Sequence, residues 1–84
     1  MQDMVKGNDI DRVLGQVIKE IRLSKNLSQE KLAELGEFER SYISKVETGA
    51  RAIQFRTVIR LALALEMKPS ELVMEFEKHI KFGQ

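Results

Sequence analysis

Residues 27–49 read LSQEKLAELGEFERSYISKVETG. Ser28 precedes a first turn that contains an acid, as at the start of many helices, and Gly36 interrupts this helix about eight residues later. A second helix is predicted over residues 40–48, with Gly49 in the position that usually ends a helix. The stretch therefore predicts two short helices joined by a tight turn.

Apolar residues repeat with helical spacing on both sides of this pair. One stripe of them predicts a helix over about residues 9–25. A further stripe runs from Phe55 to Leu65, and Pro69 stands where proline is tolerated, at the first position of a last helix. Strand-like alternation of apolar and polar residues is absent from the sequence. The sequence therefore predicts an all-α fold.

The length and composition of the chain fit one small globular domain. Its 84 residues are 43% hydrophobic and 32% charged. We expect a compact five-helix domain over residues 9–82, preceded by a flexible segment at residues 1–8. There is no Cys and only one His, so neither a metal centre nor a cofactor is expected. No apolar run approaches the ~20 residues of a membrane-spanning helix, so no membrane partner is expected.

Positive charge is concentrated in one part of the chain. The net charge is only +1, but residues 40–60 carry five basic side chains and a single acid, Glu47. A nearly neutral protein with one basic stretch can present positive charge from one surface, as nucleic-acid-binding proteins do. The same charges would also suit ordinary solvated helix faces, so charge alone leaves both interpretations open.

Two short helices joined by a tight turn indicate a helix-turn-helix, whose second helix enters the major groove of DNA.

The order and spacing of residues 14–72 resemble the λ-repressor/Cro-like helix-turn-helix domain, also called the xenobiotic-response-element type. In size, and in the Arg-Ser-Tyr-Ile-Ser sequence at residues 40–44, the chain is more similar to the controller proteins of restriction–modification systems. The resemblance implies a λ-repressor-like fold and a DNA-binding function. The matching segments are Ile21-Arg22, residues 27–33, residues 41–49, residues 58–65 and the Pro-Ser-Glu-Leu sequence at residues 69–72.

The resemblance implies that four residues of the second helix face the DNA bases. Their spacing of i, i+1, i+4 and i+5 places them on one helical face. Arg40, near the end of the helix that enters the groove, is the best candidate for a bidentate contact with guanine. Lys45 would reach either a guanine or only a phosphate. The four residues are Arg40, Ser41, Ser44 and Lys45.

Other positions match residues that hold the DNA backbone. Gln29, at the start of the first helix of the pair, would bind a phosphate with help from the positive helix N-terminus. Thr48 and Arg51 would contact phosphates and so set the register of binding. Tyr42 would meet a thymine methyl group or a phosphate, or would simply pack against the protein.

Glu47 is the one acid in the basic stretch, and as a free charge it would oppose DNA binding. In the family, the matching acid pairs with an arginine of the preceding helix, here Arg22. We therefore expect a partly buried ion pair between Arg22 and Glu47; the alternative is an exposed Glu47.

Some positions depart from the family pattern. Glu37 occupies a turn position that is often glycine, and the glycine stands one residue earlier, at Gly36. Glu39 replaces the usual Ser, Thr or Asp before the second helix and is a weaker cap. Glu66 also replaces a common glycine. These turns are therefore less firmly predicted than the helices.

The last helix carries more apolar surface than one buried face requires. The family often dimerises through this region, so we expect Val73, Phe76 and Ile80 to form an isologous homodimer interface. The alternative is that all three residues close the monomer core. Glu34 and Glu37 lie near the turn, where some family members contact RNA polymerase; a solvated acidic face is the alternative.

Together these features predict a non-enzymatic, cytoplasmic regulator of bacterial or phage origin. It would bind an operator in double-stranded DNA as a homodimer and control its own restriction–modification operon, without a small-molecule ligand. The alternatives are a phage-type repressor and an antitoxin-like protein whose main partner is another protein. No convergent acid, base and nucleophile set points to an enzyme.

Overall fold

The predicted all-α fold of five helices is confirmed. The computed structural model describes residues 7–80, and within that range the chain forms five helices and no strand. Most of the predicted flexible segment (residues 1–8) and the predicted domain end at residue 82 lie outside the described residues. The first helix starts slightly earlier than predicted, a difference of the usual size for helix ends. The helices are α1 (Gly7–Ser24), α2 (Gln29–Gly36), α3 (Arg40–Thr48), α4 (Phe55–Ala64) and α5 (Pro69–Glu77).

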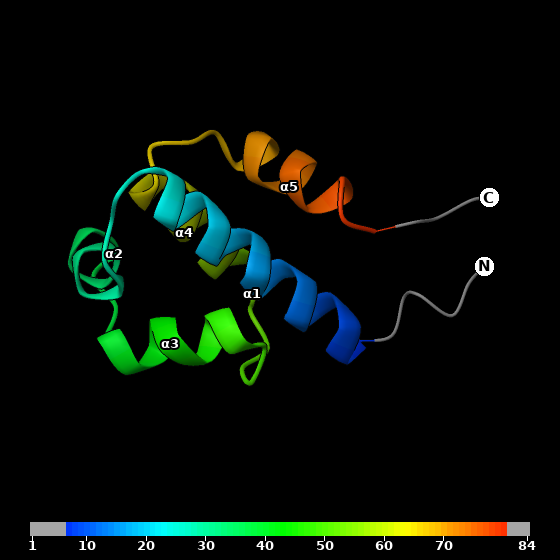
Figure 1. Cartoon of the computed structure of the whole chain (residues 1–84), viewed down its shortest axis with the longest axis horizontal. Helices are drawn as coiled ribbons and strands as arrows, with labels where there is room; N and C mark the ends of the chain where they lie inside the picture. Colours follow the sequence, from blue (N-terminus) through cyan, green and yellow to red (C-terminus); the bar gives the residue numbers. More distant parts are fainter. Residues whose placement is uncertain (1–6, 81–84) are drawn as a thin grey trace.

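The helices are arranged around α1 (Figure 1). α1 crosses the molecule diagonally with α5 along one side and α3 along the other, while α2 lies at one end and α4 passes behind. Contacts join α1 to α3 and α5, α2 to α3 and α4, and α4 to α5. The helix-turn-helix of α2 and α3 is therefore supported by α1 and α4.

Each helix contributes at least one completely buried side chain to a single core. Ile18 of α1, Leu32 of α2, Ile43 of α3, Leu61 of α4 and Leu72 of α5 all have 0% exposure. Burying an aliphatic side chain of this size stabilises a fold by roughly 1.5–3 kcal/mol. The apolar stripes in the sequence therefore mark the faces that meet in this core.

At Gly15 the backbones of α1 and α3 come into direct contact. A Cβ atom on Gly15 would lie 2.1 Å from the carbonyl oxygen of Val46 and 3.0 Å from that of Glu47. Gly49 has φ +81°, and a Cβ atom there would lie 2.8 Å from the Cα atom of Arg12. Gly15 was not singled out from the sequence, although an isolated glycine in a helical pattern can signal close packing.

Two glutamates take backbone conformations that favour glycine. Glu37 ends α2 with φ +59°, and Glu66 has the same φ after α4. The left-handed region costs a residue with a Cβ atom roughly 1–2 kcal/mol. Gly36 is the last residue of α2, so the left-handed position of the turn falls on Glu37 and not on the glycine.

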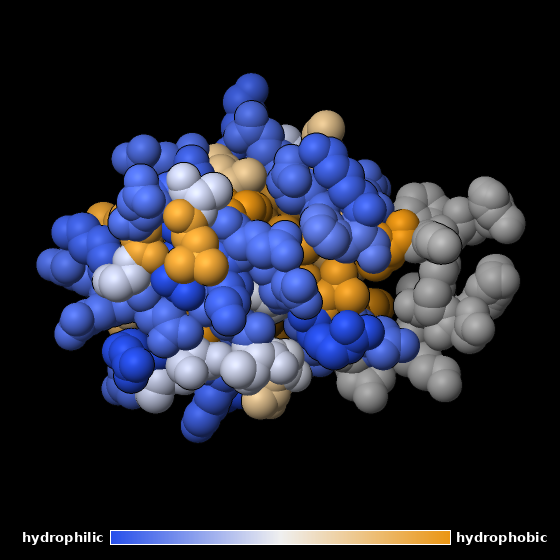
Figure 2. Space-filling model, viewed as in Figure 1, coloured by the Kyte–Doolittle hydropathy of each residue, from blue (hydrophilic) through white to orange (hydrophobic). Residues whose placement is uncertain are grey.

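The face of the molecule shown in Figure 2 is mainly hydrophilic, with hydrophobic residues visible only in separate patches. Within residues 7–80, no helix has both the length and the apolar character needed to cross a membrane.

Candidate nucleic-acid interface

One face of α3 presents the side chains that were predicted to face DNA bases. Ile43 and Val46 are fully buried, so the residues on the opposite side of the helix point outward. Ser44 is half-buried at the edge of this face. Arg40, Ser41, Lys45 and Thr48 are exposed. The structure thus brings the predicted residues together on one accessible face, which we call the recognition face (Arg40, Ser41, Ser44, Lys45 and Thr48).

The N-terminus of α3 is weakly capped. Glu39 occupies the N-cap position with extended backbone, but its side chain makes no capping hydrogen bond. By contrast, Ser28 caps α2, and its hydroxyl oxygen accepts a 2.9 Å hydrogen bond from the Lys31 amide. Arg40 is exposed and is the first residue of α3. The backbone amides at this helix N-terminus are therefore not capped by the side chain that precedes Arg40.

A buried ion pair holds α3 against α1. The Arg22 Nε donates to Glu47 Oε2 at 2.6 Å, and Arg22 Nη2 donates to Glu47 Oε1 at 3.1 Å. The two side chains are only 7% and 2% exposed. Arg22 Nη1 also donates to the Leu27 carbonyl at 2.7 Å, which ties in the chain before α2. The acid of the basic stretch is therefore neutralised inside the protein and does not oppose DNA at the surface.

Gln29 joins α2 to the same buried pair. Its Nε2 donates to Glu47 Oε1 at 2.9 Å, a contact that sequence spacing does not reveal. An amide nitrogen carries two hydrogens, so one donor remains for a phosphate. The phosphate-binding role of Gln29 stays a prediction, and its contact with Glu47 couples the start of α2 to the orientation of α3.

Aromatic contacts hold the other flank of α3. The half-buried Tyr42 ring stacks on Phe38, with ring centroids 5.4 Å apart and an interplanar angle of 21°. The exposed Arg51 guanidinium lies over the Tyr42 ring, 5.3 Å from its centroid. Of the roles considered for Tyr42, packing is the one visible in the protein alone. The role of Phe38 had no signal in the sequence beyond its position in the turn.

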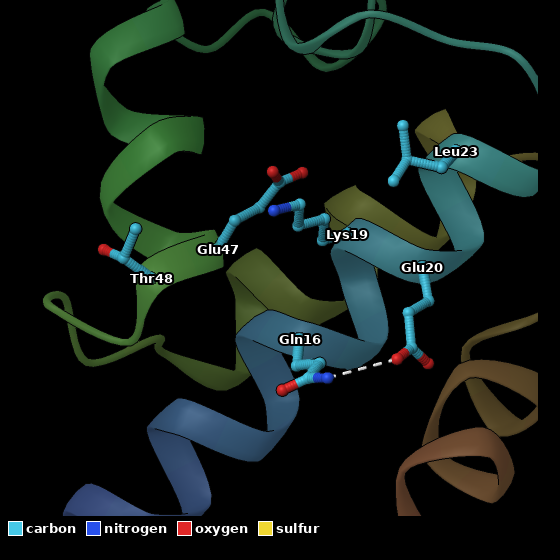
Figure 3. A pocket seen from close by; sticks show the side chains of 6 residues that line it. All are labelled: Gln16, Lys19, Glu20, Leu23, Glu47 and Thr48. Carbon is cyan, nitrogen blue, oxygen red and sulfur yellow. Dashed lines mark hydrogen bonds between the residues drawn. The ribbon is translucent and has the colours of Figure 1, made fainter.

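Two hollows border the recognition face. One lies between α1 and the end of α3, and Figure 3 shows Lys19 directed toward Glu47 while Gln16 Nε2 donates to Glu20 at 3.2 Å. The other is lined by turn residues together with Tyr42, Lys45, Arg51 and Arg60. In the described part of the chain, no three His, Asp or Glu side chains are grouped as a metal site would require.

The predicted dimer residues are not equally accessible on the last helix. Leu72 is completely buried in the core, whereas Val73 is 40% exposed. Phe76 and Ile80 are half-buried. The neighbouring Met74 is 57% exposed, so α5 does leave apolar surface beyond what it packs on the core.

Comparison with known proteins gives the same class. The Helix-turn-helix family matches residues 18–72. Control protein C.BamHI from Bacillus amyloliquefaciens is 40% identical over 67 residues, which cover 79% of this chain and 83% of the relative. Control protein C.SmaI from Serratia marcescens is 38% identical over 65 residues, covering 77% of each chain.

Solved structures of controller proteins share the fold. The restriction–modification controller protein C.AhdI from Aeromonas hydrophila is 42% identical, with a TM-score of 0.71 over 76% of this chain and 96% of its own. The controller protein C.Esp1396I, solved as a tetramer in complex with its natural 35 base-pair operator, is 29% identical, with a TM-score of 0.79. That match covers 82% of this chain and 91% of the other.

The fold and the exposed face of α3 define a helix-turn-helix DNA-binding regulator. With the similarities above, the chain belongs to the helix-turn-helix family and, within it, to the control proteins of restriction–modification systems. The predicted fold family is confirmed. So is the predicted non-enzymatic function, because this family consists of DNA-binding regulators.

Proposed function

We propose that this protein binds an operator upstream of its own restriction–modification operon and regulates transcription there as a homodimer. The observation that carries the proposal is the recognition face, an exposed, basic and polar surface on a short helix whose other side is locked into the core. Because its partner is DNA in a bacterial or phage-infected cell, we place the protein in the cytoplasm.

In this proposal α3 lies in the major groove and reads the bases. Arg40 forms a bidentate contact with a guanine, while Ser41 and Ser44 make single hydrogen bonds to base edges. Lys45 reaches a guanine or a neighbouring phosphate. A good bidentate contact discriminates against the wrong base by about 1–3 kcal/mol, so Arg40 carries the largest share of specificity.

Phosphate contacts on both sides of α3 would fix its register. Gln29 at the start of α2 would hold one strand, and Thr48 at the end of α3 and Arg51 in the following loop would hold the other side of the groove. The Thr48 hydroxyl donates to the Lys45 carbonyl at 3.1 Å, which keeps its oxygen available to accept but requires rotation before it donates to a phosphate.

A homodimer would present two recognition faces to the operator. One helix-turn-helix reads about half an operator, and two related by a two-fold axis read half-sites one DNA turn, about 34 Å, apart. Val73, together with the edges of Phe76 and Ile80, would form the isologous contact. The complex of C.Esp1396I, a tetramer on a 35 base-pair operator, supports an oligomeric binding mode.

A contact with RNA polymerase is a separate part of the proposal. Glu34 and Glu37 are exposed beside the turn, and the Glu34 side chain forms a long surface contact, 3.5 Å, with Lys31. Charge reversal at both acids should abolish activation of a promoter while leaving operator affinity unchanged. Unchanged activation would reject the contact.

The experiment that tests the DNA-binding role compares two variants that each lose one positive charge. Arg40→Ala should weaken binding to the operator by roughly tenfold or more and relax specificity at one base pair. Lys68→Ala removes a charge from an exposed position outside the basic stretch, just before α5, and should change affinity by less than about threefold. Equal losses from both variants would mean that α3 does not read the bases.

A further inference from the structure

Arg60 of α4 is tied into the turn between α2 and α3. Its Nη2 donates to the Gly36 carbonyl at 2.9 Å and to the Glu37 carbonyl at 3.3 Å. These are carbonyls at the C-terminal end of α2, where an intrahelical donor is missing and a positive charge is favourable. The guanidinium thus binds the turn at Glu37, the residue held at φ +59°.

The same guanidinium covers an aromatic ring. The Arg60 Cζ lies 4.2 Å from the centroid of the Phe38 ring, within cation–π range. Phe38 in turn stacks on Tyr42, and Arg51 lies over Tyr42. Four side chains from the turn, α3, the following loop and α4 therefore form a continuous series of contacts, which we call the Arg60 stack (Arg60, Phe38, Tyr42 and Arg51).

We infer that Arg60 is a positioning residue for the DNA interface, acting through Phe38 and Tyr42 on the placement of Arg51. This inference rests on the proposed function, because Tyr42 and Arg51 matter here as parts of the DNA-facing surface. Arg60 had been counted from the sequence among the basic residues that present charge. Its two carbonyl bonds and its ring contact give that charge an internal role.

Only arginine combines the two contacts that this role requires. A guanidinium is planar, so it can lie on a ring and donate from its edge at the same time. A lysine ammonium would keep the charge but would have to choose between the ring and the carbonyls. The Arg60→Lys variant therefore distinguishes a positioning role of Arg60 from a simple electrostatic role.

Tyr42 provides a direct measurement of the stack. It is the one tyrosine of the chain, which has no Trp, so near-UV circular dichroism in the tyrosine band reports on this ring alone. Arg60→Met and Arg60→Lys should both reduce that signal in the free protein. Arg56→Met, which removes another exposed arginine of α4, should leave it unchanged.

The decisive experiment is a double-mutant cycle in operator binding, at a temperature where far-UV circular dichroism shows every variant folded. Arg60→Met and Arg60→Lys should each weaken binding by roughly fivefold to tenfold, and Lys68→Met, which removes an exposed charge outside the basic stretch, by less than about twofold. In an Arg51→Met background, Arg60→Met should have almost no further effect, because the residue that it positions is gone.

Additive effects of Arg60→Met and Arg51→Met would overturn the inference and indicate that Arg60 meets DNA itself. Wild-type affinity of Arg60→Lys would overturn it as well, because charge alone would then suffice. An unchanged tyrosine band in Arg60→Met would show that the stack does not depend on Arg60. Failure of the wild-type protein to prefer operator over random DNA is a different result, since it removes the proposed function itself.

Discussion

The two flanks of α3 are held in opposite ways. On the α1 side, Arg22 and Glu47 form an ion pair with side chains 7% and 2% exposed, beside the backbone contact at Gly15. On the other side, the half-buried Tyr42 stacks on Phe38, and the exposed Arg51 and Arg60 lie over these two rings. The first flank sets the angle between α3 and the core through buried contacts, whereas the second is held by contacts between side chains that reach the surface. We call the flank at Arg22 and Glu47 the rigid edge of α3 and the flank at Tyr42 its adaptable edge.

The largest effect on stability is expected from removing one partner of the ion pair on the rigid edge. Glu47→Ala leaves Arg22 buried without its partner and also removes the acceptor of Gln29 Nε2. We expect the free energy of unfolding to fall by about 3–5 kcal/mol, measured by urea denaturation at matched protein concentration. Glu34→Ala breaks an exposed pair and should cost less than about 1 kcal/mol. A loss under about 1 kcal/mol for Glu47→Ala would show that the pair does not lock the helices.

Gly15→Ala tests the backbone contact beside that pair. The new methyl group would meet the Val46 carbonyl oxygen at 2.1 Å, so α1 and α3 must separate. We expect a loss of about 2–3 kcal/mol in the same denaturation experiment, against the helix propensity gain of alanine. Gln16→Ala, at an exposed position of the same helix, should change stability by less than about 0.5 kcal/mol. A stabilising effect of Gly15→Ala would contradict the close approach of the two helices.

The adaptable edge should respond less to truncation. Phe38→Leu removes the stack on Tyr42 and the ring under Arg60 but leaves an apolar group in place. We expect a loss of about 1–1.5 kcal/mol in stability, smaller than that of Glu47→Ala. A larger loss than Glu47→Ala would mean that the aromatic flank, rather than the ion pair, fixes α3.

The smallest expected effect is a gain in stability. Glu37→Gly removes the cost of a left-handed conformation at a Cβ-bearing residue and should stabilise the protein by about 0.5–1 kcal/mol. Glu34→Gly, inside α2, should instead destabilise by about 1 kcal/mol, because glycine is a poor helix former. Thermal unfolding of both variants gives the comparison. A loss of stability in both variants would show that the backbone of Glu37 is not strained.

Structural features that follow a regular spacing of residues could be predicted from the sequence. Features that depend on how the helices cross one another could not. The helices follow from apolar spacing, and Glu47 stood out as the one acid in a basic stretch, with Arg22 supplied by the family resemblance. The contact at Gly15 depends on how α1 crosses α3, which no local pattern encodes. The Arg60 stack joins residues from separate segments of the chain, so the position of Phe38 under Arg60 emerges only from the packed structure.

The function of this protein as an operator-binding regulator can be tested by its binding to the DNA just upstream of its own gene. This binding should be measured across a salt series with random DNA as competitor, together with a nuclease footprint. We expect specific binding that weakens steeply with salt, and paired protection about one DNA turn apart. Weak binding equal to that of random DNA would contradict this function and would make the face of α3 a surface for a protein partner.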